Sequence, residues 1–198
     1  MARDVLWAPW DAPGLEHMRL EIGAAAISAD GAIIAISAGG VFRASYQIVS
    51  DAAWRVRDVW IMASHPAAIA LDLHADDDGH WSNTSGEALP TLDGCRDVDF
   101  AATPFTNTLP IRRLGLQPGE SAEVAVAYID APSLEVTTVR QRYTCHASGA
   151  DGGRYRFEAL PYAALPDGFS AELSVDADGL VLDYPPLFRR MWSRESQP

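Results

Sequence analysis

The sequence predicts a mainly β protein built from one long antiparallel sheet. Apolar residues alternate with polar or small residues along most of the chain, and this period of two is the period of a strand. Short segments rich in Asp, Gly and Pro separate the alternating stretches, as expected for turns between consecutive antiparallel strands. A sheet of this length must curl or close to hide its apolar face.

The expected strands and turns follow one another through the chain. Alternation is clearest at residues 69–74, 124–128, 154–158, 173–175 and 180–184. Turns are expected at residues 29–31, 76–79, 118–120 and 151–153, where Gly follows or precedes Asp, Glu or Pro.

Helical signals are confined to one segment near residues 104–114. Thr103 has the character of an N-cap, and Pro104 follows it at the first helical position. Gly115 provides a stop, whereas Pro110 opposes a long regular helix because it lacks an amide hydrogen. We therefore predict a turn-rich segment that leads into one short helix, with a second short helix near residues 186–192 as a further option.

Composition limits the class of protein. A length of 198 residues and a hydrophobic content of 48% predict a single domain over residues 1–198. The net charge of -12 opposes binding to nucleic acids and to anionic membrane surfaces. No apolar run approaches the roughly 18 to 20 residues of a membrane span, and the first ten residues do not resemble a signal peptide. Since Cys95 and Cys145 need no pairing, we expect a cytoplasmic protein with free buried thiols and no stable membrane insertion.

The segment 94–116 is the most informative part of the chain. It contains two carboxylates, three guanidiniums, two prolines and an Asn between apolar residues. Cys95, residues 97–99 and residues 103–114 resemble the signature of a glycolipid-binding protein family, in which a Cys-x-Asp-Val-Asp strand runs into Thr-Pro-Phe-Thr-Asn-Thr-Leu-Pro-Ile-Arg-Arg-Leu. The likeness continues at Tyr46 and at residues 51–57, 79–81, 141–143 and 179–188.

This resemblance implies a fold, an assembly and a function. The family fold is a spiral β-roll, a long antiparallel sheet wrapped round a single short helix, and its members are homodimers. The glycolipid label of the family comes from likeness to bacterial lipid and lipoprotein carriers. The resemblance thus implies a non-catalytic protein that holds a glycolipid or another amphipathic small molecule without a cofactor. Because the start of the sequence does not resemble an export signal, its role should differ from periplasmic transport.

Asp97 and Asp99 are the leading candidate site residues, because alternate residues of a strand share one face. Arg112 and Arg113 are the nearest candidates to pair with them. These groups could form the polar floor of a cavity that binds sugar hydroxyls or a phosphate. Alternatively, they form an ion-pair network that fixes the helix against the sheet, with Asn107 satisfying backbone groups of the turn.

Two further functions remain open at this point. Paired carboxylates also serve glycoside hydrolysis, so a hydrolase that uses Asp97 and Asp99 is the less favoured alternative. The other alternative is a structural or protein-interaction roll with a packed interior. The six tryptophans could line a cavity or fill the core and a dimer interface. The candidate ligand-binding residues are Asp97, Asp99, Asn107, Arg112, Arg113, Trp81 and Tyr143, with no catalytic or metal-binding residue predicted.

Two charged patterns have simpler interpretations. The stretch from His74 to His80 contains three aspartates, but its spacing fits no known metal motif and favours a polar hairpin turn. Four arginines alternate on two strands that we expect to be neighbours. Such a patch could hold an anionic head group, although a solvated outer face that pairs with acidic residues is favoured. These arginines are Arg140, Arg142, Arg154 and Arg156.

Overall fold

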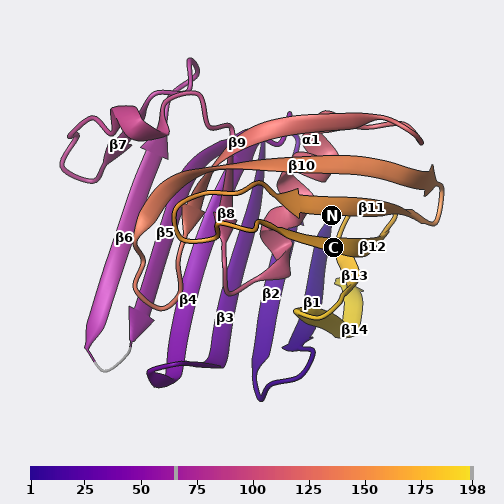
Figure 1. The fold of residues 1–198 in the computed structure, drawn as a ribbon, viewed down its shortest axis with the longest axis horizontal. Coiled ribbons are helices and arrows are strands. Elements are labelled where there is room, and N and C mark those ends of the chain that lie inside the picture. The colour runs from indigo at the N-terminus through magenta and orange to yellow at the C-terminus, as the bar shows by residue number, and fades with distance from the viewer. Residues whose placement is uncertain (65–66, 197–198) are drawn as a thin grey trace.

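The computed structural model describes residues 1–64 and 67–196, which fold into a curled β-sheet around a short helix (Figure 1). The first strands are β1 (Ala2–Pro9), β2 (Leu15–Ile22), β3 (Ala26–Ser37), β4 (Gly40–Asp51), β5 (Val56–Ser64), β6 (Ala68–Ala75) and β7 (Trp81–Asn83). The central segment contains the 3-10 helices η1 (Pro90–Leu92) and η2 (Pro104–Asn107), β8 (Asp97–Phe100) and the helix α1 (Thr108–Leu114). The remaining strands are β9 (Ser121–Ile129), β10 (Val136–Gly149), β11 (Gly152–Ala159), β12 (Phe169–Asp176), β13 (Val181–Tyr184) and β14 (Phe188–Ser196).

Within the described residues, fourteen strands form one sheet in the order β7-β6-β5-β4-β3-β2-β1-β14-β13-β12-β11-β10-β9-β8. The sheet is not closed, because β7 and β8 lie at its two edges. Among the strands of residues 1–64 and 67–196, all pairs are antiparallel except β8 and β9, which are parallel. The predicted long antiparallel sheet is therefore observed, with this parallel pair added at one edge. A parallel pair needs a long crossover, and the segment 101–120 with its helix supplies one.

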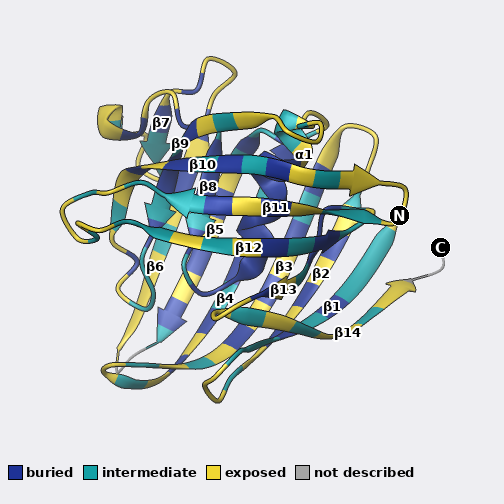
Figure 2. Ribbon diagram, turned by 45° about the vertical axis from the view of Figure 1, so that its right-hand side comes forward, coloured by how far each residue is buried: buried dark blue, intermediate teal, exposed yellow. Residues whose placement is uncertain are grey.

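The sheet curls back on itself, so that two of its parts face one another. In Figure 1, β9–β12 cross in front of β1–β5, and α1 lies between the two layers. Buried residues alternate with exposed ones along these strands (Figure 2), because each layer turns one face inward and one outward. The predicted curled sheet around a single short helix is confirmed.

The helix joins the cores of the two layers. Phe105 and Leu109 belong to a large apolar cluster that lies mainly on the inner face of β1–β8 and includes Ala127 and Ile129 of β9. Ile111 belongs to a second cluster on the inner face of β9–β13. Each such buried side chain contributes about 1.5–3 kcal/mol, so the segment stabilises the contact between the layers.

The predicted helix has the predicted ends. Thr103 is the N-cap, and its side chain accepts a hydrogen bond from the backbone N of Phe105 at 3.1 Å. Gly115 ends the helix in the left-handed region at φ 57°. Pro110 lies in the first turn of α1, the part of a helix that best tolerates proline.

Two expectations from the sequence are wrong. Residues 29–31 form no turn, because they lie inside β3, where Gly31 pairs with Tyr46 of β4. Residues 186–192 form no helix, because β14 begins at Phe188 and pairs with β1. The expected turns at 76–79 and 151–153 lie at hairpins, and that at 118–120 lies between α1 and β9.

Two further properties bear on the class of protein. In the described part of the chain, none of the helices combines the length and the apolar character needed to cross a membrane. Cys95 and Cys145 are free and buried, as the sequence predicts.

Candidate ligand-binding site

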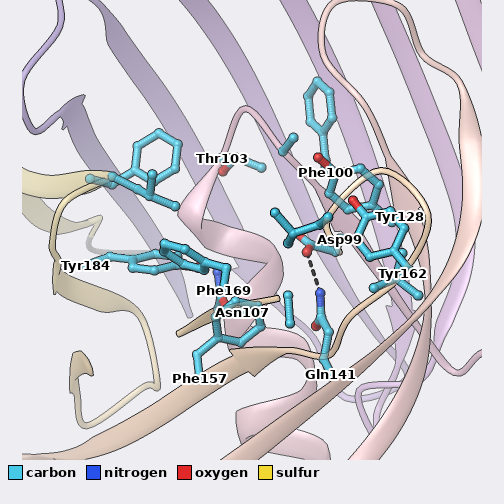
Figure 3. A pocket seen from close by; sticks show the side chains of 16 residues that line it. Asp99, Phe100, Thr103, Asn107, Tyr128, Gln141, Phe157, Tyr162, Phe169 and Tyr184 are labelled. Carbon is cyan, nitrogen blue, oxygen red and sulfur yellow. Dashed lines mark hydrogen bonds between the residues drawn. The ribbon is translucent and has the colours of Figure 1, made fainter. Parts of the chain in front are cut away.

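A pocket of about 320 Å³ lies between the helical segment and the layer formed by β9–β12 (Figure 3). Its walls are mainly aromatic, since six strands and the β11–β12 loop each contribute a ring. The aromatic lining residues are Phe100, Tyr128, Phe157, Tyr162, Phe169, Tyr184 and Phe188. Asp99, Thr103, Asn107 and Gln141 provide the polar part of the wall. A mainly apolar pocket of this size with a few convergent polar groups is typical of small-molecule sites.

The edge strand β8 places Asp99 in this pocket. Val98 and Phe100 turn into the core of the first layer, where the ring of Phe100 meets Tyr46 edge-on at 6.0 Å. Because alternate residues face opposite sides of a strand, Asp97 and Asp99 must then face the second layer. The geometry predicted for the two carboxylates is confirmed.

Asp99 is held by neutral donors. Its carboxylate accepts hydrogen bonds from Nε2 of Gln141 at 2.6 Å and from Oγ1 of Thr106 at 3.2 Å. No Arg or His side chain is among the described residues that line the pocket. Burial raises the pKa of the Asp99 carboxyl, and the two hydrogen bonds lower this pKa only in part.

Two tyrosines face Asp99 across the pocket. Figure 3 shows Tyr128 and Tyr162 beside the carboxylate. Burial, and then the charge of Asp99, raise the pKa values of both phenols. Both rings therefore stay protonated near neutral pH, and their hydroxyls can donate or accept hydrogen bonds.

A buried network supports the polar wall from behind. The hydroxyl of Tyr143 donates to Oδ1 of Asn107 at 3.0 Å and lies 3.4 Å from Oε1 of Gln141. Nδ2 of Asn107 donates to the carbonyl of Pro104 at 3.4 Å. These contacts fix the amides of Asn107 and Gln141, so the site is formed before any ligand enters.

Asp97 has a different role from Asp99. Its two oxygens accept hydrogen bonds from Nε and Nη2 of Arg113 at 3.0 Å and 2.5 Å, and its side chain is fully buried. This bidentate pair joins β8 to α1, which is the structural alternative predicted for these charges. Since Asp97 does not line the pocket, the pocket presents one carboxyl and not the pair that glycoside hydrolysis uses.

The other predicted site residues lie elsewhere. Arg112 stacks on the ring of Trp54 at 5.2 Å and donates to the carbonyl of Ala177 at 3.4 Å. Trp81 is buried, and its Nε1 donates to the carbonyl of Cys95 at 3.0 Å. Of the seven candidate residues, Asp99 and Asn107 line the pocket, and Tyr143 supports them.

Gln141 and most of the aromatic lining were not among the predicted site residues. One signal for Gln141 is present in the sequence, because it lies in the inward-facing phase of β10 between Val139 and Tyr143. A buried amide among apolar neighbours needs a polar partner, and here that partner is Asp99.

The stretch from His74 to His80 forms a polar turn. Asp76 accepts hydrogen bonds from the backbone N and Nδ1 of His80 at 2.8 Å and 3.1 Å. Oxygens of Asp76 and Asp78 and a nitrogen of His80 lie within 4.8 Å of one another, but all three residues are exposed. The contacts are those of a turn stabilised by its own side chains.

Three of the four arginines in the patch on β10 and β11 lie close to acidic residues on the outer face. Arg140 and Arg142 contact Glu123 at 2.6 Å and 2.5 Å, and Arg156 lies 3.9 Å from Glu158. This is the solvated alternative predicted for the arginine patch.

Comparison with known proteins places the chain in a family. Residues 4–190 match the family described as "Putative glycolipid-binding". The chain belongs to this glycolipid-binding family. A crystal structure of a DUF1089 family protein from Pseudomonas aeruginosa is similar, with 38% sequence identity and a TM-score of 0.78. The likeness covers 92% of this chain and 95% of that chain. No curated protein matches the sequence.

Proposed function

We propose that this protein binds a neutral, hydroxyl-bearing amphiphile, with its polar end at Asp99. The observation that carries the proposal is a single carboxyl, held by neutral amide and hydroxyl groups, in an otherwise aromatic pocket. The family description names glycolipids, which are ligands of this chemical class.

The polar wall suits sugar hydroxyls. A carboxyl, two amides and two phenols offer both donors and acceptors, and each sugar hydroxyl can use both. Aromatic side chains supply apolar faces for the ring and the chain of such a ligand. An anionic head group would lie close to Asp99 without a compensating Arg among the described lining residues, so electrostatic repulsion disfavours a phosphate.

The role proposed is passive binding. The pocket of about 320 Å³ supports a ligand-binding roll over a roll with a packed interior. With both oxygens of Asp97 engaged by Arg113, no observation favours hydrolysis by two carboxyls.

Calorimetric titration tests the proposal. The probes are octyl glucoside, octyl phosphate and octylamine, each below its critical micelle concentration. We expect octyl glucoside to bind the wild-type protein more tightly than either charged probe. In Asp99→Asn its affinity should fall by about tenfold or more, because hydrogen bonds to a charged group contribute about 1.5–3 kcal/mol.

Asp72→Asn is the matched control, because Asp72 is exposed on the outer face of β6. It should leave the affinity unchanged. Tighter binding of octyl phosphate than of octyl glucoside would contradict the proposal, as would equal affinity of Asp99→Asn and wild type.

We also propose that the protein forms a homodimer through the outer face of β3–β5. Ile34, Ile36 and Met62 point outward there and are 56%, 49% and 43% exposed. Light scattering after gel filtration should give the mass of a dimer for the wild type and of a monomer for the double variant Ile34→Glu/Met62→Glu. A monomeric wild-type protein would contradict this.

A cytoplasmic location is proposed as well, since free thiols at Cys95 and Cys145 suit a reducing compartment. Recovery of the protein from the periplasmic fraction of cells would exclude it.

A further inference from the structure

A second pocket lies next to the Asp99 pocket. It has a volume of about 510 Å³ and lies between the β1–β2 loop, the end of β3 and the start of β14. Ala101, Leu187 and Phe188 line both pockets, so the two spaces share a wall. We name the second pocket, with its lining residues, the Trp10 groove.

The chemistry of the Trp10 groove differs from that of its neighbour. Asp11 is the one charged residue among the described residues that line it. Phe42 is buried on its inner side, and Trp10 is half-buried. Alanines form much of the remaining wall, and their small side chains leave the space open. These alanines are Ala12, Ala35, Ala38, Ala101, Ala102 and Ala131.

The two pockets together form a polar end and an apolar end. Asp99, Asn107 and Gln141 line only the first pocket, whereas Trp10, Ala35 and Phe42 line only the second. The shared wall is made of two apolar side chains and an alanine, so an alkyl chain that leaves the first pocket meets no charged group there.

We propose that the Trp10 groove holds the alkyl chain of the ligand whose polar head lies at Asp99. This inference rests on the proposed function and makes it more specific, because it assigns the ligand to the single-chain amphiphiles with a neutral hydroxylated head. The alkyl chain of the ligand passes along the side chains of Leu187 and Phe188, and its end lies beside Trp10.

The test uses butyl, hexyl and octyl glucosides, titrated below their critical micelle concentrations into wild type, Ala35→Phe and Asp99→Asn. Ala35 lines the groove but not the Asp99 pocket, so a larger side chain there fills the groove alone. Ala32→Phe is the matched control, because Ala32 lies on the exposed outer face of the same strand. Ala38→Phe, in the exposed β3–β4 turn, is a second groove-filling variant in case Ala35→Phe does not fold.

In the wild type we expect the affinity to rise by up to about fourfold for each added methylene. Ala35→Phe should lower the affinity for octyl glucoside at least tenfold and leave that for butyl glucoside unchanged. Ala32→Phe should match the wild type.

The outcomes separate the two proposals. Binding that depends on Asp99 but not on chain length, or that is unaffected by both groove-filling variants, overturns the groove assignment alone. Absence of binding by every glucoside, or binding that Asp99→Asn does not weaken, overturns the proposed function and the groove assignment with it.

Discussion

Glu16 and Asp99 are two carboxyl side chains that the fold places in apolar surroundings, yet they meet different groups. Asp99 opens onto the pocket, whereas Glu16 is 3% exposed within the first layer. Oε1 of Glu16 accepts hydrogen bonds from the hydroxyls of Tyr46 and Thr103, both at 2.6 Å. In the described part of the structure, its Oε2 has no hydrogen-bond partner. Thr103 also caps the helical segment, so Glu16 connects the sheet to the start of that segment.

Glu16 should make stability depend on pH. Burial raises its pKa from 4.5 to about 7 in the folded protein, more than the hydrogen bonds from Thr103 and Tyr46 lower it. At pH values between 4.5 and about 7, the Glu16 carboxyl is protonated in the folded protein and ionised in the unfolded protein. The contribution of Glu16 to stability is therefore greatest below pH 4.5, falls as the pH rises toward 7, and is then constant.

The variant Glu16→Gln tests this dependence, because an amide mimics the protonated acid. Between pH 5 and pH 8, the wild type should lose about 2–3 kcal/mol more unfolding free energy than Glu16→Gln. Urea denaturation at the two pH values measures the difference. Parallel pH profiles for the two proteins would show that Glu16 is ionised in the fold throughout this range.

The Asp97–Arg113 pair gives a second prediction at this scale. Arg113→Met leaves the buried Asp97 without its cation, which should cost about 3–5 kcal/mol of stability. Arg112→Met is the control on the neighbouring residue, which contacts a ring and a carbonyl and forms no ion pair with a carboxylate in the described part of the chain.

The double variant Asp97→Asn/Arg113→Met should recover part of the loss seen in Arg113→Met. Chemical denaturation gives all the values. Equal losses in Arg112→Met and Arg113→Met would refute a dominant role for the ion pair.

At the scale of elements, the ends of the helical segment could be predicted from neighbouring residues, whereas the parallel strand pair and the absence of a turn at 29–31 depend on residues far away in the sequence. The helix was predicted because its N-cap and its terminal glycine lie within the segment itself. The parallel pairing of β8 with β9 depends on where the crossover segment ends. The alternation of apolar and polar residues within a strand does not reveal this. The expected turn at 29–31 failed for a similar reason, because an Asp-Gly pair signals a turn unless a distant residue needs the glycine.

Tyr46 is that distant residue. A Cβ added at Gly31 would lie 2.2 Å from the ring of Tyr46, so the glycine allows the ring to pack across β3. Gly31→Ala should displace Tyr46 and lower stability by about 1–3 kcal/mol. Gly149→Ala is the control, since a Cβ there meets no atom within 4 Å. Thermal unfolding compares the two, and equal effects would contradict the packing argument.

In the candidate site, too, residues within one segment could be predicted, whereas residues brought together from distant segments could not. Asp99 and Asn107 were found because they belong to one distinctive segment. The rings of Tyr128, Tyr162 and Phe169 come from distant parts of the chain, and only the curl of the sheet brings them together. The tryptophans, for which both a cavity wall and the core were open alternatives, divide between the two, since Trp7 and Trp81 fill the core and Trp10 lines the adjoining groove.

At the scale of the whole molecule, function follows from how the sheet curls. Two apolar clusters fill the interior, one mainly on β1–β8 and one on β9–β13, with β9 contributing to both, and residues of the helical segment belong to each cluster. Beside this segment the two layers leave the Asp99 pocket and the adjoining Trp10 groove. The helical segment thus holds the layers together and also forms part of the pocket wall.

A crystal structure of the protein with octyl glucoside is the most direct test of the central claim. It should show sugar hydroxyls within hydrogen-bond distance of the Asp99 carboxyl and the amide of Gln141, with the glucose ring between Tyr128, Tyr162 and Phe169. An empty Asp99 pocket, with the ligand bound elsewhere on the sheet, would contradict the claim.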